Sequence, residues 1–83
     1  MTEITVQCLG AFRDLGDHFV VSVEETDVAS IRSAVSSYLG ECGRTDLNGV
    51  LSRSVFAEGD EILKDHFTVA STSVSLLPPV AGG

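Results

Sequence analysis

The sequence is poor in basic residues: it has five Lys and Arg against twelve Asp and Glu, a formal net charge of −7. Proteins that bind nucleic acid neutralise phosphates with Lys and Arg, so this balance disfavours nucleic acid as a partner. It disfavours an anionic membrane surface for the same reason. The acidity would serve either solubility or the attraction of a basic partner protein, whose association it would accelerate.

Cysteine is also scarce, since Cys8 and Cys42 are the only two, and they stand far apart with no pair of histidines nearby. A zinc site therefore lacks ligands, and we expect free thiols, with Cys8 as a small buried apolar residue. The start of the chain, "TEITVQCLG", has no basic segment followed by a long apolar run. We expect no signal peptide, no membrane span and a cytoplasmic location.

Catalytic motifs are missing as well. His18 and His66 are isolated, and no serine or cysteine stands in a nucleophile motif. The chain has no glycine-rich loop of the kind that binds phosphate. We expect that it binds no cofactor or metal of its own and is not an enzyme.

The apolar residues that are present follow strand and helix periods. Eighty-three residues predict one domain. Residues 3–9 and 18–25 alternate between apolar and polar, which predicts two strands joined as an antiparallel hairpin across a break that contains Gly10 and Gly16. The region 41–51 predicts either a short helical turn or a loop. Later strands are expected at 52–57, at the short segment "ILK", and at 73–77.

Residues 26–39 change to a helical period, with Thr26 or Asp27 able to cap the start and Gly40 placed as the cap at the end. The apolar stripe of this helix consists of Val28, Ile31, Val35, Tyr38 and Leu39. One helix between two pairs of strands predicts an α+β fold. The helix would cover one face of the sheet and leave the other to solvent or to a partner.

The last stretch, "SLLPPVAGG", follows the final predicted strand directly, so we divide the chain into a domain at 1–77 and a tail at 78–83. Pro78 and Pro79 fix two φ angles and favour an extended course, which lowers the entropy lost when the tail enters a groove. Val80 and Ala81 have small apolar side chains that a partner could contact. We therefore expect a partner to bind the segment from Leu77 to Ala81.

Two glycines complete the stretch. Gly82 and Gly83 have no Cβ, so the backbone could pass through a narrow channel and leave the terminal carbonyl open to attack. A carboxylate is a poor acyl acceptor until it is activated. Adenylation by ATP would give a mixed anhydride, from which sulfur could displace AMP and leave a thiocarboxylate on Gly83. The chain would then be a substrate and carrier for enzymes.

These segments resemble the small subunit of molybdopterin synthase (the MoaD family), a ubiquitin-like sulfur carrier. The resemblance is closest in "SLLPPVAGG" and extends back through "DEILKDH" and the spacing from Asp65 and His66 to the tail. The opening strand, the "FRDLG" break and the helix fit more loosely. Residues 70–73, "ASTS", depart from the family, which usually has an acidic turn with glycine there.

The resemblance implies a β-grasp fold, a mixed sheet packed on one main helix. It implies that an ATP-dependent enzyme adenylates and then sulfurylates Gly83. It further implies that a large synthase subunit receives the tail in a heterotetramer, where the sulfur builds the molybdopterin dithiolene. Three alternatives stay open: a carrier for thiamine, cysteine or tRNA thiolation, a ubiquitin-like protein modifier, and a plain binding module that docks by its open sheet face.

Overall fold

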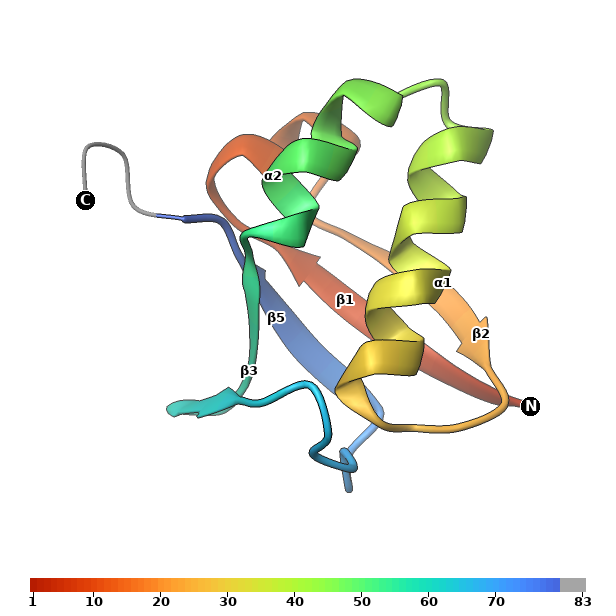
Figure 1. Ribbon diagram of the computed structural model, residues 1–83, viewed down its shortest axis with the longest axis vertical. Helices are drawn as coiled ribbons and strands as arrows, with labels where there is room; N and C mark the ends of the chain where they lie inside the picture. Colours follow the sequence, from red (N-terminus) through yellow and green to blue (C-terminus); the bar gives the residue numbers. More distant parts are fainter. Residues whose placement is uncertain (80–83) are drawn as a thin grey trace.

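The computed structural model describes residues 1–79, so Val80, Ala81, Gly82 and Gly83 lie outside the described residues. Five strands form one sheet in the order β2-β1-β5-β3-β4. Figure 1 shows the two α-helices on the same face of this sheet. The strands are β1 (Thr2–Cys8), β2 (His18–Val23), β3 (Val55–Glu58), β4 (Glu61–Leu63) and β5 (Ser73–Leu77), and the helices are η1 (Gly10–Leu15), α1 (Val28–Glu41), η2 (Thr45–Leu47) and α2 (Asn48–Ser52).

The sheet is mixed. β1 pairs antiparallel with β2, as the predicted hairpin requires, and β3 pairs antiparallel with both β4 and β5. β1 and β5 run parallel in the centre, so the first and last strands of the domain lie side by side. The predicted α+β class is therefore confirmed, with α1 as the main helix.

The core lies between α1 and one face of the sheet. The alternating residues Ile4, Val6 and Cys8 of β1 are buried, as their period predicted. The stripe of α1 is buried at Val28, Ile31, Val35 and Leu39. Tyr38, on the flank of that stripe, stacks on Phe19 of β2 with ring centroids 4.2 Å apart. Phe56 of β3 is fully buried, in accord with the usual burial preference of Phe.

The expected cap at Gly40 is wrong, because α1 continues through Gly40 to Glu41. The turn that ends the helix is at Gly43, whose φ of +71° favours glycine. The Arg44 N–H donates to the Leu39 carbonyl at 2.8 Å, and the Gly43 N–H donates to the Gly40 carbonyl at 3.2 Å. These two bonds form a Schellman motif, which satisfies carbonyls at the end of the helix.

The predicted strand at 52–57 starts too early, because α2 takes up residues 48–52 and β3 begins at Val55. Leu47 and Leu51 are four positions apart and both buried, which extends a helical turn rather than a strand. The Ser54 hydroxyl donates to the Val50 carbonyl at 2.6 Å and closes the turn between α2 and β3. Of the two forms left open for 41–51, the short helical turn is therefore the one observed.

Asp27, one of the two candidates that the sequence offered, caps α1, and this cap should make stability depend on pH. The Ser30 N–H and hydroxyl donate to its two carboxylate oxygens at 3.2 and 2.7 Å. These bonds lower the pKa of the Asp27 carboxyl below its ordinary value, so its stabilising effect is present above the unfolded-state pKa and is lost as pH falls through the lower, folded-state pKa. We expect Asp27→Ala to lower the Tm at pH 7 and the gap from wild type to shrink below about pH 4.

Asn also accepts hydrogen bonds at a cap but does not titrate, so Asp27→Asn is the control. We expect it to have a smaller loss of Tm at pH 7 than Asp27→Ala. Thermal unfolding from pH 7 to pH 2 measures all three proteins. A gap between wild type and Asp27→Ala that stays constant over this range would contradict the prediction.

Candidate functional site

The candidate site is the root of the tail, where the chain leaves the sheet after Leu77. β5 runs parallel to β1 with Leu76 opposite Cys8, so the residues after both strands emerge at the same edge of the sheet. Figure 1 shows the end of β5 beside the loop that follows β1. The tail therefore starts next to η1, a segment far away in sequence.

Pro78 lies against Gly10 at this edge. Gly10 has φ of +56°, and a Cβ built on it would lie 2.5 Å from Cγ of Pro78. No real side chain tolerates such a distance, so the absence of a Cβ at position 10 lets the proline ring sit there. Pro78 is half-buried and Pro79 is exposed. The structure thus holds the first tail residue on the domain and turns the second to solvent.

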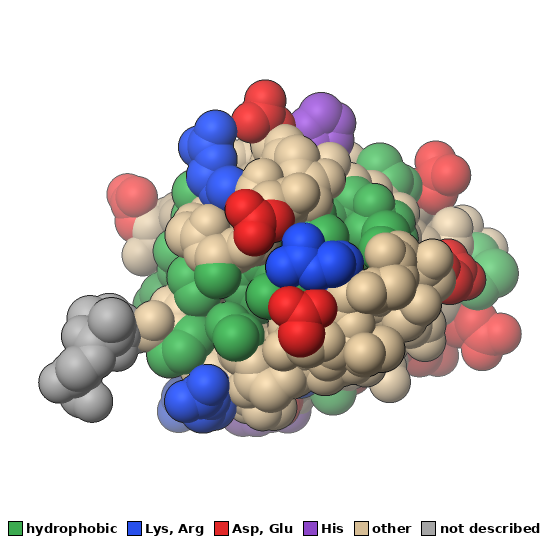
Figure 2. Space-filling view, turned by 90° about the horizontal axis from the view of Figure 1, so that it is seen from above, with side chains coloured by type: hydrophobic (Ala, Val, Ile, Leu, Met, Phe, Trp, Pro, Cys, Tyr) green, Lys and Arg blue, Asp and Glu red, His purple; other side chains and the backbone are tan. Residues whose placement is uncertain are grey.

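Leu77, the last residue of β5, is the third predicted partner-binding residue that the structure places. It is half-buried and stands opposite Val55 across the β3–β5 pair. Val55 is 37% exposed, so together they form an apolar surface next to the tail root. Figure 2 shows hydrophobic side chains gathered near the end of the described chain, and acidic and basic side chains interleaved elsewhere on that face. The predicted roles of Val80, Ala81, Gly82 and Gly83 fall outside the described residues.

Sequence reasoning assigned Gly10 to a turn and missed its contact with the tail. The sequence marks Gly10 as a turn residue, but only the parallel register of β1 and β5 brings Pro78 to it. The available signal was weak: a glycine directly after the first strand and a proline directly after the last one.

We expect Gly10→Ala to destabilise the domain through two separable effects. An alanine in the left-handed region costs about 1–2 kcal/mol. Overlap with the Pro78 ring adds about 1–3 kcal/mol or pushes the tail root away. Pro78→Ala removes Cγ and Cδ and leaves Cβ, which would lie 3.7 Å from the new methyl group, an ordinary contact. In the double variant the overlap is therefore absent, and only the free-energy cost of the left-handed backbone at position 10 should remain.

A double-mutant cycle measured by urea unfolding tests this contact. Gly10→Ala should lower the free energy of unfolding by less in the Pro78→Ala background than in the wild type. Equal costs in the two backgrounds would show that Pro78 does not rest on Gly10.

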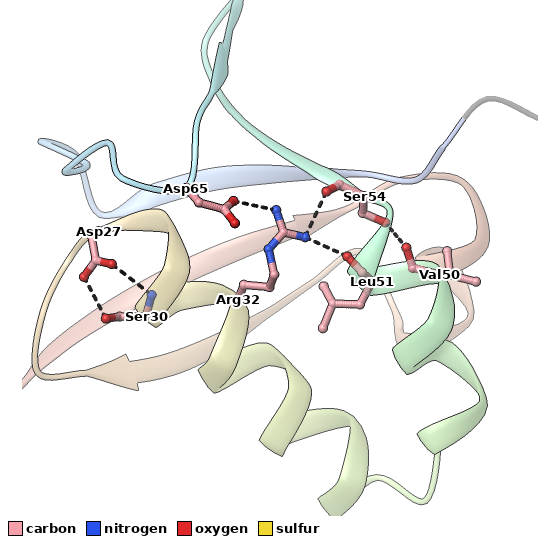
Figure 3. A network of polar contacts seen from close by, with 7 residues as sticks. All are labelled: Asp27, Ser30, Arg32, Val50, Leu51, Ser54 and Asp65. Atoms are coloured by element: carbon pink, nitrogen blue, oxygen red, sulfur yellow. Dashed lines mark hydrogen bonds and ion pairs between the residues drawn. The ribbon is translucent and has the colours of Figure 1, made fainter. Parts of the chain in front are cut away.

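Arg32 of α1 binds the junction between α2 and β3, next to the strand that pairs with β5. From the sequence, Arg32 is most simply a solvated surface residue or one partner of a weak surface ion pair; it does pair with the exposed Asp65, yet its own side chain is only 21% exposed. One guanidinium nitrogen, Nη1, donates to the carbonyls of Leu51 and Ser54 at 2.7 and 2.9 Å. The other, Nη2, donates to Asp65 at 3.0 Å, and the guanidinium lies 5.3 Å from the centre of the Phe56 ring. Figure 3 shows α1, the α2–β3 junction and the segment after β4 meeting at this one side chain.

The "ASTS" turn has its own anchor, on Glu58 at the end of β3. The Ser71 N–H and hydroxyl donate to one carboxylate oxygen of Glu58 at 3.1 and 2.8 Å. These bonds lower the pKa of the Glu58 carboxyl. A serine therefore holds the chain before β5 at the place where the resembled family has an acidic turn.

Both cysteines are free thiols, as expected. Cys8 is buried in the core, and burial, followed by the charge of Asp17, raises the pKa of its thiol. A raised pKa keeps the thiol protonated and less reactive, in line with the predicted packing role.

Comparisons with known proteins support the fold. No family model matches the chain, and no curated protein matches it. Among solved structures, the crystal structure of SAMP1 from Haloferax volcanii matches with a TM-score of 0.68 and 16% identity, over 98% of this chain and 99% of that one. The likeness is one of fold: the chain has the ubiquitin-like β-grasp fold. Within residues 1–79, no helix is both long and apolar enough to cross a membrane.

Proposed function

We propose that this chain is a sulfur carrier whose Gly83, as the C-terminal residue of the mature protein, is adenylated and converted to a thiocarboxylate. The observation that carries the proposal is the tail root. β5 ends at Leu77, with Pro78 seated on Gly10 and Pro79 in solvent, and the sequence continues with "VAGG". A β-grasp domain with such an arm is suited to presenting a terminal carboxylate to another protein.

The proposed chemistry needs a partner that binds ATP. A carboxylate oxygen of Gly83 attacks the α-phosphorus of ATP, and pyrophosphate leaves. The terminal sulfur of a persulfide on the partner attacks the acyl carbon, and AMP leaves. A second thiol then reduces the resulting acyl disulfide, which frees the thiocarboxylate and forms a disulfide on the partner. This chain supplies the acyl group and no catalytic residue.

The recipient of the sulfur is proposed from the resemblance of the tail to that of the molybdopterin synthase small subunit. In that case the sulfur passes to a pyranopterin precursor in the active site of a large synthase subunit, within a cytoplasmic heterotetramer. Leu77 and Pro78, both half-buried at the sheet edge, would lie at the mouth of that site. Pro79, Val80 and Ala81 would enter it, and Gly82 would provide clearance beside Gly83. The partner would meet an acidic domain, so its docking surface should be basic.

Intact mass analysis tests the carrier function. The protein is incubated with an adenylating and sulfurylating enzyme, ATP and a persulfide donor. We expect a gain equal to the difference between sulfur and oxygen, located on Gly83 by fragmentation. The unreacted protein in the same experiment reports whether the mature chain ends at Gly83. No gain with a partner that adenylates the chain would overturn the proposal.

A second experiment separates the possible recipients of the sulfur. The chain is expressed in four strains, which lack the small carrier of the molybdopterin, thiamine, cysteine or tRNA thiolation pathway. We expect it to restore growth or product formation only in the strain that lacks the molybdopterin carrier. Protein conjugates of higher mass that disappear when Gly83 is deleted would instead support a modifier. Lys64 is the only lysine of the chain, so polymers linked through lysine could form at one site only.

A further inference from the structure

The outer edge of β2 and the flank of α1 border a groove of about 410 Å³. Residues 20–22 line it on the strand side, and Ala34, Ser37, Tyr38 and Glu41 line it on the helix side. The helix residues recur at spacings of three and four, so they form one continuous stripe along α1. Figure 1 shows β2 at the margin of the sheet, with α1 running beside it. The groove is therefore elongated and runs along β2.

The backbone of this edge is free on alternate residues. Antiparallel neighbours alternate between pairs that exchange both backbone hydrogen bonds and pairs that exchange none. The Cys8 N–H donates to the Asp17 carbonyl at 2.9 Å, which fixes the alternation along the β1–β2 register. It follows that His18, Val20 and Ser22 turn their N–H and C=O groups away from β1. Among the described strands β2 pairs with β1 alone, so these groups have no strand partner in residues 1–79.

The groove has one acidic residue in its lining, and the segment that follows its strand is acidic as well. Glu41 lines it at the end of α1, and the exposed Glu24 and Glu25 follow directly after β2. Neither Lys nor Arg is among the described residues that line it. A second copy of this chain would bring the same acidic edge and another net charge of −7 against it. The charge therefore favours a basic occupant over self-pairing.

We propose that the β2 edge binds an extended segment of a partner protein, which adds to the sheet as a further strand. Main-chain hydrogen bonds to His18, Val20 and Ser22 would supply affinity, as in other cases of strand addition. Apolar side chains of the segment face the groove between Val21 and Tyr38. Lys or Arg side chains at its two ends meet the acidic residues of the groove lining and of the segment after β2. The site lies two strands away from β5, so it is separate from the tail and independent of the sulfur chemistry.

Titration of the isotope-labelled full chain with a synthetic peptide, acetyl-KKVTVTVKK-amide, tests the site by nuclear magnetic resonance. We expect saturable shifts that are largest at the amides of His18, Val20 and Ser22, with slower hydrogen exchange at these positions. The acidic peptide acetyl-EEVTVTVEE-amide should not bind. Shifts centred on β4 or on the open sheet face, or no saturable shift with the basic peptide, would overturn the proposal. Shifts of the same amides with protein concentration alone would identify a second copy as the occupant and would overturn it too.

Val20→Pro is the sharpest variant, because the Val20 N–H points away from β1. Proline there removes an edge donor and places its ring in the path of the added strand, without removing a bond of the β1–β2 ladder. We expect affinity for the basic peptide to fall about tenfold or more, whereas Val20→Ala, which keeps the N–H, should stay within about threefold. Equal affinity of Val20→Pro and Val20→Ala would contradict strand addition.

A charge reversal gives a second test that does not depend on how the strand tolerates proline. Glu41→Lys should weaken binding of the basic peptide by about threefold to tenfold. Glu61→Lys, on β4 at the opposite edge of the sheet, makes the same change in net charge and should have no such effect. Equal weakening by both variants would show that only the overall charge matters and would overturn the assignment to this edge.

Discussion

Gly82→Val should abolish conversion of Gly83 to a thiocarboxylate while leaving the Tm unchanged. The buried apolar core of the described chain extends from Ile4 to Leu76, and we expect position 82, in the tail after it, to contribute nothing to its packing. A β-branched side chain beside the reacting carbonyl would widen the tail where we propose that a partner encloses it. Displacement of a reacting group by about an ångström can cost a hundredfold in rate, and we expect at least about that loss. Intact mass and thermal unfolding of the same preparation measure the two quantities.

Gly82→Ala is the graded control, since its single methyl group should give a smaller loss of rate than valine. Two outcomes would count against the prediction. A large fall in Tm for the valine variant would mean that the tail packs on its own domain. Undiminished conversion would mean that clearance at position 82 plays no part in activation.

Arg32→Ala should destabilise the domain by about 2–4 kcal/mol, the largest effect that we expect from any charged residue here. The change leaves the carbonyls of Leu51 and Ser54 without their donor and breaks the pair with Asp65. It also uncovers the ring of Phe56, over which the guanidinium lies. Small domains have a total stability of only about 5–15 kcal/mol, so urea unfolding should detect the loss readily.

Arg53→Ala makes the same change in net charge one residue before Ser54 and serves as the control. Its side chain is exposed, and within residues 1–79 it makes one hydrogen bond, from Nε to the Gly49 carbonyl at 3.3 Å. We expect it to stay within about 0.5 kcal/mol of the wild type, as surface substitutions usually do. Arg32→Lys keeps the charge but cannot reach both carbonyls and Asp65 together, so it should lose an intermediate amount. A loss for Arg32→Ala no larger than that for Arg53→Ala would show that its contacts contribute nothing.

Local patterns predicted the elements well where burial follows a simple period. The alternation of Ile4, Val6 and Cys8 and the stripe from Val28 to Leu39 gave β1 and α1 within a few residues. The pattern was less informative from residue 41 to residue 54. There Gly43 and not Gly40 ends the helix, and α2 continues through Ser52, where the third strand was expected to begin. Both outcomes depend on where Leu39, Leu47 and Leu51 can be buried together, which short windows of sequence do not contain.

The sequence by itself determined the acidic charge, the α+β order of elements and the composition of the tail, because each depends on residue types and on spacing along the chain. Only the tertiary structure decided which distant segments meet. The parallel pairing of β1 and β5 places Gly10 under Pro78. Folding of the chain after α1 brings two backbone carbonyls and Asp65 to Arg32. The sheet order leaves β2 with a free edge. Such contacts arise because distant segments are buried in one shared core, so a short window of sequence does not predict them.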